Sequence, residues 1–415
     1  MRYFSQLIIL IAVNFFLSKA LASTPLTFKE ALATAYCNNP ELQAEINKAN
    51  AMRGSFIQSG LYPNPQVALT AENFGGSGKY SGYEAAETTL AITQPIPLGN
   101  RLFYLKNAAY VDYLASLAQI SVQQAALYRA VGIAYVDAFY AGQWHKVTQK
   151  LANLNQGIVA AIEKRVNAGA GSQLDLRLAQ IRLGDAKIQE NRAAREALLQ
   201  RAKLARLLGD RLKVNRPLVD KGLPSVSLNW SGLLKKLSQS PQLRQIQLQL
   251  QAKRASISAV KKSVWPDLNV QLGARHFADD DSLAAVAAVA APIPVYDRNQ
   301  GRILTAEAQY SQVAYEFQGM KLTIRQSVYT AFLQAKQSRY EANLVTSSLL
   351  PLARNAINLA QEGFKMGRYT YIELSTALNM LYEEERHYQQ AHADYHKALI
   401  ELTALLGLNS VKESK

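Results

Sequence analysis

Two histidines near the C-terminus have the spacing of a metal-binding pair. His392 and His396 stand one helical turn apart, so two imidazole nitrogens could reach one ion. Asp394 does not lie on the same helical face, and no third ligand is evident. His392 also falls between Tyr388 and Tyr395 on an apolar stripe, which favours a packed histidine over a metal ligand.

A second polar group could hold a cation. His276 is followed by three consecutive acids, Asp279, Asp280 and Asp281. A solvated acidic loop explains them more simply. The chain has no H-E-x-x-H motif, no phosphate-binding glycine loop before a helix and no nucleophile elbow. We therefore expect no enzyme activity, no cofactor and no resident metal.

Short motifs recur along the chain, each at an interval between 197 and 203 residues. The matching pairs are Asn39-Pro40 with Ser240-Pro241, Tyr62-Pro63-Asn64-Pro65 with Trp265-Pro266-Asp267-Leu268, Pro95-Ile-Pro97 with Pro292-Ile-Pro294, and Gly169 with Gly367. An interval this long indicates a duplicated half-structure rather than a solenoid of short repeats. We predict a signal peptide over 1–22, a first repeat over 23–210, a linker over 211–228, a second repeat over 229–409 and a tail over 410–415.

The N-terminus has the features of a secretory signal. Arg2 precedes an apolar stretch, and Ala20-Leu21-Ala22 forms a cleavage site, so the mature chain is expected to start near Ser23. A single cysteine, Cys37, excludes an internal disulfide framework. The formal net charge of +15 is spread over the helical segments without a block of like charges, so we expect no nucleic-acid partner.

Four segments alternate like β-strands, namely residues 65–74, 85–94, 267–277 and 283–291. In the first, Val67 and Leu69 alternate with Gln66 and Thr70. Each segment is about ten residues long, which is the length of a tilted transmembrane strand. Residues 75–82 form a loop by composition, and each Pro-x-Pro motif is expected to end the strand before it.

The remaining segments are typical of unusually long helices. We predict helices over 26–60 and 100–168, the second of which holds no proline and would extend roughly 100 Å. Pro351 should kink or split the counterpart over 301–366. The last helix carries a coiled-coil seam of Leu374, Leu378, Leu381, Glu385, Tyr388, His392, Tyr395, Leu399, Leu402 and Leu406. The equivalent seam of the first half holds Leu174, Leu178, Ile181, Ile188 and Leu199.

These elements predict a mostly α-helical chain with a small β part, in which long coiled-coil hairpins are duplicated. Four strands form an open sheet, and its edge N–H and C=O groups cannot remain unpaired in lipid. Other copies of the chain must therefore close it. Two copies give eight strands and an interior filled by side chains, whereas three give twelve strands and a lumen. A duct for solutes favours a homotrimer.

The order of helix, two strands, proline turn and long helical hairpin, all duplicated, resembles the TolC-like outer-membrane efflux channels. Two motifs are similar to their CzcC-type heavy-metal branch, namely Gln94-Pro-Ile-Pro-Leu-Gly-Asn-Arg101 and Pro292-Ile-Pro-Val-Tyr-Asp-Arg-Asn-Gln-Gly301. Three further segments fit the family's second hairpin turn, namely Leu349-Leu-Pro-Leu-Ala353, Gly363-Phe-Lys-Met-Gly367 and Tyr371-Ile-Glu-Leu374. The resemblance covers residues 26–409. It implies a trimer whose twelve-stranded β-barrel sits in outer-membrane lipid of a Gram-negative bacterium. An α-helical barrel then extends into the periplasm, toward a periplasmic adaptor and a proton-driven RND-type inner-membrane pump.

The resemblance also assigns roles to the two helix-to-helix turns. In that family these turns are tips that pack against the adaptor, here Ala168, Gly169, Ala170, Met366, Gly367 and Arg368. The residues alone indicate two helix C-caps that require positive φ at glycine. Family members hold the closed tip with a Tyr and an Arg at positions that here hold Phe364 and Tyr369, so that network is not expected, although Arg368 could substitute.

Two acids match positions near the family's periplasmic constriction. Asp175 and Glu373 each follow a turn glycine by six residues, and an acidic ring in a narrow pore attracts cations. The alternative is that both are ordinary acids near helix N-termini, where the helix dipole stabilises a negative charge.

Three functions are compatible with these patterns. The first is a passive outer-membrane duct for heavy-metal cations, and the second is a similar duct for drugs or for type I protein secretion. The third, of a different class, is a periplasmic coiled-coil scaffold, which would require the β-like segments to be loops.

Overall fold

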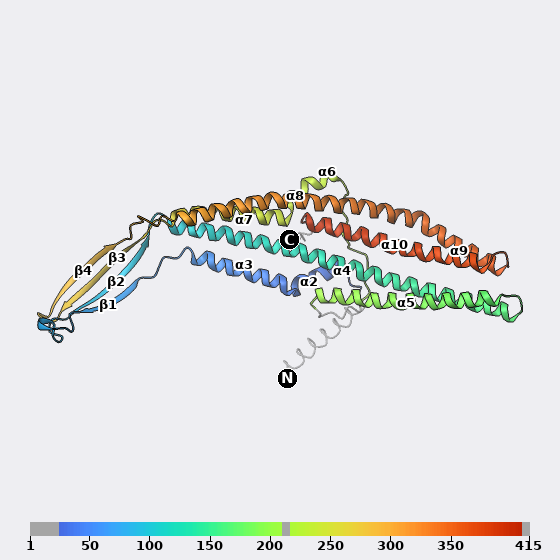
Figure 1. Cartoon of the computed structure of the whole chain (residues 1–415), viewed down its shortest axis with the longest axis horizontal. Helices are drawn as coiled ribbons and strands as arrows, with labels where there is room; N and C mark the ends of the chain where they lie inside the picture. The colour runs from blue at the N-terminus through green and yellow to red at the C-terminus, as the bar shows by residue number, and fades with distance from the viewer. Residues whose placement is uncertain (1–24, 210–215, 409–415) are drawn as a thin grey trace, which may run out of the picture. The chain divides into compact units, whose positions relative to one another are not determined.

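The computed structural model describes residues 25–209 and 216–408, so the predicted signal peptide and tail lie outside the described residues. Two compact units can be distinguished, and each takes segments from both halves of the chain. The strand unit comprises residues 44–120 and 242–321, and the helical unit comprises the described residues of 1–43, 121–241 and 322–415. The long helices α4 (Arg101–Asn167) and α8 (Gln300–Leu344) contribute to both units (Figure 1).

The strand unit contains one antiparallel four-stranded sheet in the order β1-β2-β3-β4. Its strands are β1 (Gln66–Glu72), β2 (Glu87–Pro97), β3 (Asp267–Phe277) and β4 (Ser282–Ala290). All four predicted strands are therefore confirmed. Within the described chain β1 and β4 each pair on one side only, so the sheet has two open edges (Figure 1).

The two faces of this sheet differ in chemistry. The register places Val67, Leu69, Leu90, Ile92 and Leu272 on one face, and all five are exposed large apolar side chains. The opposite face carries an ionic cluster in which Arg275 contacts Glu87 at 2.7 Å, Glu72 at 3.2 Å and the Thr89 hydroxyl at 2.9 Å. One face is thus suited to lipid and the other to an aqueous interior.

The expectation that Pro-x-Pro ends both return strands is wrong for β2. Pro95, Ile96 and Pro97 continue the strand and pair with residues 267–269 of β3. The Leu98 N–H donates to the Pro266 carbonyl at 3.4 Å, so by alternation the backbone groups of Pro95 and Pro97 point away from β3. Both prolines are tolerated because β1 begins at Gln66, opposite Thr93. No strand on that side reaches Pro95 or Pro97, so neither position needs a backbone N–H for pairing. β4, in contrast, ends at Ala290, before the second motif.

Two helices of the strand unit precede β1 and β3, namely α3 (Pro40–Gln58) and α7 (Pro241–Lys262). The single helix expected over 26–60 is divided at Asn39 into α2 (Phe28–Asn38) and α3. Asn39 precedes a proline, which disfavours helical backbone, and its side chain accepts from the Leu42 N–H at 2.9 Å. The loop between β1 and β2 includes one 3₁₀ turn, η1 (Gly78–Tyr80).

The helical unit contains two hairpins. The first joins α4 to α5 (Gln173–Leu207), and the second joins α9 (Leu350–Lys365) to α10 (Tyr371–Leu405). A π-helical turn, η3 (Val345–Leu349), separates α8 from α9, so the segment is split as expected, with Pro351 in the first turn of α9. The short α6 (Trp230–Lys236) and η2 (Leu237–Gln239) lie between the hairpins in sequence.

One apolar core holds the ends of the two hairpins together. It includes Leu151, Ile158 and Ile162 of α4, Ile357 and Phe364 of α9, and Leu374, Leu378 and Leu381 of α10. The predicted seam of α10 is buried at its leucine positions. None of the helices in the described ranges combines the length and apolar character that a membrane-spanning helix needs.

The predicted seam of α5 is wrong for the single chain. Leu174, Leu178, Ile181, Ile188 and Leu199 are between 40% and 66% exposed. The helix instead buries small residues and two leucines against its neighbours, namely Leu176, Ala179, Ala193, Ala197 and Leu204. Heptad spacing identified a real apolar stripe, but intrachain packing uses a different face of the helix.

Candidate docking tips and pore constriction

The first hairpin turn is closed by backbone hydrogen bonds around Gly169. Its φ of 71° lies in the left-handed region, which side chains disfavour. The Gly169 N–H donates to Val166 O and the Ala170 N–H to Arg165 O, both at 2.9 Å. This is the Schellman pattern of a helix C-terminus. Ser172 then caps α5 by accepting from the Leu174 N–H at 3.2 Å.

The second turn repeats this arrangement. Gly367 has φ 73°, its N–H donates to Phe364 O at 3.1 Å, and the Arg368 N–H donates to Gly363 O at 2.8 Å. All six predicted tip residues are exposed. A Cβ placed on Gly169 or Gly367 would meet no atom of the chain within 4 Å. A substitution at either glycine would therefore act through backbone strain and through whatever docks from outside.

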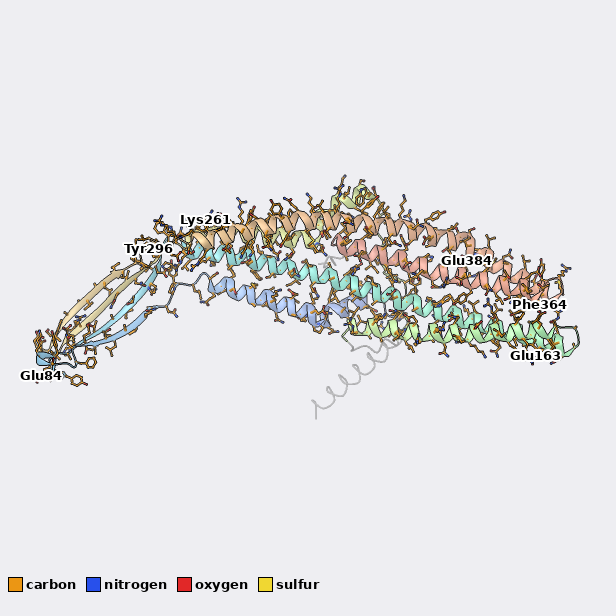
Figure 2. The ribbon with its side chains drawn as sticks, viewed as in Figure 1. Glu84, Glu163, Lys261, Tyr296, Phe364 and Glu384 are labelled. Atoms are coloured by element: carbon orange, nitrogen blue, oxygen red, sulfur yellow. The ribbon has the colours of Figure 1, made fainter. Side chains whose placement is uncertain are left out.

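A contact that the sequence did not predict joins the two hairpins. Arg165, in the last turn of α4, donates from Nη1 to the Phe364 carbonyl at 2.9 Å, and its guanidinium carbon lies 5.0 Å from the centre of the Phe364 ring. Tyr369 packs its ring over Gly363, where an added Cβ would lie 2.1 Å from Cδ2. Phe364 and Tyr369 thus serve packing at these turns. Figure 2 labels Phe364 and Glu163 near the ends of the two hairpins.

Glu373 is part of a complete capping box at the start of α10. Its Oε2 accepts from the Thr370 N–H at 2.7 Å and from the Thr370 hydroxyl at 2.9 Å, and the Glu373 N–H donates to Thr370 Oγ1 at 3.4 Å. The backbone hydrogen bond and then the side-chain one hold the pKa of Glu373 below its ordinary value. The side chain is exposed, so it keeps its charge and can face solvent.

Asp175 has different surroundings. It occupies the first turn of α5, where its N–H donates to Ser172 Oγ at 3.5 Å, and it is half-buried. Burial raises the pKa of Tyr371, and the opposing fields of Arg182 and Asp175 act on that phenol as well. Asp175 therefore belongs to a polar group between α5 and α10, whereas Glu373 is solvent-exposed.

His392 and His396 of α10 are packed side chains. His392 Nε2 lies 3.0 Å from the Thr346 hydroxyl, and its ring lies 4.5 Å from that of Tyr388. His396 stacks on Tyr140. Burial lowers the pKa of both imidazoles, and the described residues contain no group of three or more His, Cys, Asp or Glu side chains arranged for a metal. His276 Nε2 of β3 contacts Asp281, in the turn between β3 and β4, at 2.7 Å.

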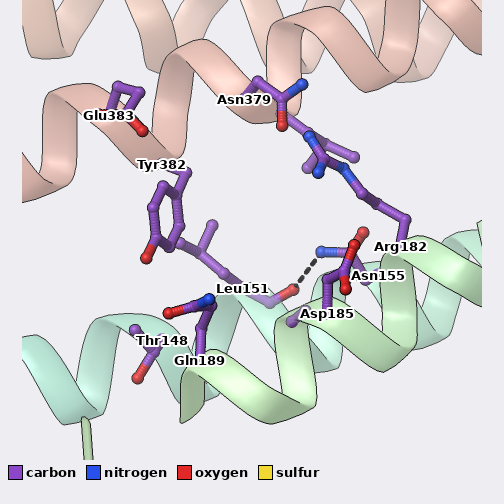
Figure 3. A pocket seen from close by; sticks show the side chains of 11 residues that line it. Thr148, Leu151, Asn155, Arg182, Asp185, Gln189, Asn379, Tyr382 and Glu383 are labelled. Carbon is purple, nitrogen blue, oxygen red and sulfur yellow. Dashed lines mark hydrogen bonds between the residues drawn. The ribbon is translucent and has the colours of Figure 1, made fainter. Parts of the chain in front are cut away.

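A cavity of about 380 Å³ opens between α4, α5 and α10. Its lining includes the polar side chains of Asn155, Arg182, Asp185, Tyr382 and Glu383, together with the apolar side chains of Leu151, Ala186 and Leu378. Figure 3 shows these side chains around the opening, with the Asn155 amide donating to the Leu151 carbonyl at 2.8 Å. No sequence pattern indicated this cavity, because its residues come from three helices without a common motif.

A family model described as outer membrane efflux protein matches residues 31–210 and 233–408. The chain belongs to this family. Outer membrane efflux proteins are channels of the Gram-negative outer membrane that extend into the periplasm, and this chain is accordingly a transport duct and not an enzyme. The scaffold hypothesis is wrong, because the β-like segments form the four-stranded sheet.

Individual relatives agree with this family. The chain is 26% identical over 393 residues to the cobalt-zinc-cadmium resistance protein CzcC of Cupriavidus metallidurans, covering 93% of this chain and 91% of that protein. It is 27% identical over 267 residues to the toluene efflux pump outer membrane protein TtgF of Pseudomonas putida, covering 59% and 53%. A crystal structure of CusC superposes with a TM-score of 0.79 at 18% identity, covering 92% and 93% of the two chains, and supports the fold.

Proposed function

We propose that three copies of this chain form the outer-membrane duct of a tripartite efflux system for heavy-metal cations. Substrate would be received from a periplasmic adaptor and a proton-driven RND-type inner-membrane pump. The observation that carries the proposal is the amphipathic sheet with two open edges. Its exposed apolar face fits lipid, and its edges need partners there.

The helical unit supports closure by further copies. Leu174, Ile181 and Ile188 form an exposed apolar stripe on α5, with one heptad between successive members. Leu352 and Leu359 are also exposed and one heptad apart on α9. Because these stripes lie on different helices, a head-to-tail contact between copies would bury both and generate a ring. Three copies give twelve strands and a lumen.

The exposed turns are suited to docking. Ala168, Gly169 and Ala170 in one turn and Gly367 in the other offer little side-chain bulk, so another backbone could approach closely. Met366 is 65% exposed and adds an apolar contact beside them. We propose that the six tip residues contact the adaptor.

The proposal also specifies the transported substrate. The match to a cobalt-zinc-cadmium resistance protein spans 93% of the chain, whereas the matches to two toluene efflux proteins span 59% and 77%. An exposed carboxylate with a lowered pKa, Glu373, would present negative charge three times around one axis and favour cations. These observations favour metal cations over organic solvents, drugs or secreted proteins.

Two measurements test this function. The detergent-solubilised protein should have three times the mass of the mature chain. Removing the chain from its host should lower the tolerated concentration of Co²⁺, Zn²⁺ or Cd²⁺ at least several-fold, and a plasmid copy should restore it. If the deletion lowers toluene tolerance and leaves metal tolerance unchanged, the transported substrate is an organic compound and not a metal cation.

A further inference from the structure

The cavity between α4, α5 and α10 is lined by two charged side chains that lack a partner of opposite charge. Arg182 and Asp185 both reach it from α5. They stand three residues apart on one helix, a spacing that allows an ion pair, yet neither forms a salt bridge or a side-chain hydrogen bond with another described residue. Figure 3 shows Arg182 directed toward α10 instead. Both charges are therefore available to a ligand.

Glu383, the third charged residue of the lining, is already paired. Its carboxylate lies 2.6 Å from the guanidinium of Arg386 on the same helix. A bound molecule with one positive and one negative group would pair both remaining charges of the cavity. An anion would leave Asp185 without a partner, and a cation would leave Arg182 without one. Enclosing an unpaired charge costs binding free energy, so the lining favours a zwitterion.

The rest of the lining supplies an apolar contact surface. Leu151 and Leu378 are buried, and they line the cavity from α4 and α10. The ring of Tyr382 packs edge-on against Trp144, with the ring centres 5.2 Å apart. Apolar walls with a few polar groups are typical of small-molecule sites, and about 380 Å³ lies at the lower end of their volumes. The ligand must therefore be small and partly apolar.

We propose that this cavity binds a free α-amino acid with an apolar side chain. The carboxylate of the ligand accepts from the guanidinium of Arg182, a charge-assisted pairing with fixed geometry. Its ammonium donates to the carboxylate of Asp185, and its side chain contacts Leu151, Leu378 and Tyr382. Each part of such a molecule thus has a partner in the lining.

A ligand in this cavity touches both helical hairpins. α4 and α5 form the first hairpin and α10 belongs to the second, so the bound molecule connects them, as Arg165 does at the turns. Separation of the hairpins at this level then requires release of the ligand. Mass action slows such opening by a factor of one plus the ratio of ligand concentration to Kd, which is about tenfold at ten times the Kd.

Calorimetric titration of the full-length protein in detergent tests the ligand class. The probe is L-phenylalanine, and two analogues each lack one charge: 3-phenylpropanoate has no ammonium, and 2-phenylethylamine has no carboxylate. We expect L-phenylalanine to bind at least tenfold more tightly than either analogue. Equal affinity for all three molecules would overturn recognition of a zwitterion.

Two variants assign each charge to its residue. Arg182→Gln should weaken L-phenylalanine at least tenfold and leave 2-phenylethylamine unchanged, whereas Asp185→Asn should weaken L-phenylalanine equally and leave 3-phenylpropanoate unchanged. This crossed pattern separates lost recognition from lost folding, which would weaken every probe. Arg177→Gln is the matched control, because Arg177 is an exposed arginine of α5 outside the lining. L-phenylalanine binding that survives both Arg182→Gln and Asp185→Asn would contradict this site.

Hydrogen exchange tests the connection between the hairpins. With L-phenylalanine at ten times its Kd, exchange at residues 378–383 of α10 should slow about tenfold. Ala186→Phe places a ring in the cavity from α5 and should abolish this response. Binding without any change in exchange would overturn the connection. Absence of binding by both L-phenylalanine and L-leucine at millimolar concentration would overturn the site itself. Neither result depends on the mass of the assembly or on metal tolerance, so the proposed function is tested separately.

Discussion

Arg165 and Phe364 connect the two helical hairpins at their turns. The arginine reaches from the last turn of α4 to the carbonyl of Phe364, at 2.9 Å, and lies over its ring. The carbonyl belongs to the C-terminal turn of α9 and also accepts from the Gly367 N–H at 3.1 Å, so Arg165 supplies it with a second donor. The negative end of the helix dipole also stabilises a cation at this position. One side chain therefore binds a helix end and connects the two hairpins.

Replacing Arg165 by Ala should loosen the two turns relative to each other. The hydrogen bond and the ring contact together should contribute about 1 to 2 kcal/mol for a half-buried site. We expect faster proteolysis at the turns and a higher basal ion conductance of reconstituted channels, without loss of trimer. Arg165→Lys retains the charge but loses the planar guanidinium donor. Its proteolysis rate and conductance should therefore lie between those of the unchanged protein and of Arg165→Ala.

A conductance equal to that of the unchanged protein, with equal proteolysis, would show that the apolar core alone holds the turns. Lys164 provides a matched control, because it is an exposed cation one residue earlier on α4. Lys164→Ala should change neither readout.

Substitutions at the two turn glycines can distinguish the effect of backbone strain from the effect on docking. Gly169→Asn should fold well, because Asn tolerates the left-handed conformation, whereas Gly169→Phe should cost about 1 to 2 kcal/mol of local strain. Neither side chain meets another atom of the chain. We expect Phe at position 169 or 367 to abolish cross-linking to the adaptor and efflux while the trimer persists.

The Asn variants then decide the cause. Retained efflux in Gly169→Asn and Gly367→Asn, with efflux lost in the Phe variants, supports close approach by the adaptor. Full efflux in both Phe variants would remove the turns from the docking surface.

The sequence predicted those parts of the fold that one element encodes by itself. Alternation revealed the strands, and the absence of proline between Asn100 and Ala168 revealed α4. The errors arose where a neighbouring segment, distant in sequence, determines the structure. Pro95 and Pro97 remain in β2 because β1 has already ended, which only the register shows. The docking and constriction roles of the predicted site residues stay predictions, and Arg165 was missed because its partner lies 199 residues away.

The exposed stripe of α5 gives a test of contact between copies. Ile181 is 64% exposed in the single chain, and burying an isoleucine contributes about 1.5 to 3 kcal/mol. Ile181→Asp should therefore weaken the trimer strongly, as should Leu359→Asp on α9, with helix content unchanged. Lys187→Asp changes an exposed residue of α5 off the stripe and serves as the control.

Trimer dissociation temperatures in detergent measure this effect. The Ile181 and Leu359 variants should dissociate well below the unchanged protein, and Lys187→Asp should match it. Equal dissociation temperatures for all four proteins would mean that the stripes remain exposed in the assembly.

Glu373 allows charge and capping to be separated. A capping box accepts Gln as well as Glu, so Glu373→Gln should keep the turn intact while removing the carboxylate. The hydrogen bonds from Thr370 depress the folded-state pKa. Their stabilising effect is therefore present above the ordinary pKa of a glutamate and is lost as pH falls through the lowered value. At neutral pH the side chain is ionised.

If three Glu373 carboxylates face one lumen, Glu373→Gln should lower the cation-over-anion permeability ratio at neutral pH. It should also weaken block by multivalent cations added from the periplasmic side. The reversal potential under a salt gradient measures the ratio, and acidification below the pKa of Glu373 should bring the unchanged channel toward the variant. Glu373→Ala removes the cap as well and should in addition make α10 fray, which increased hydrogen exchange at its first turn would report. Identical reversal potentials for the Gln variant and the unchanged channel would mean that Glu373 only caps α10 and that cation preference arises elsewhere in the duct.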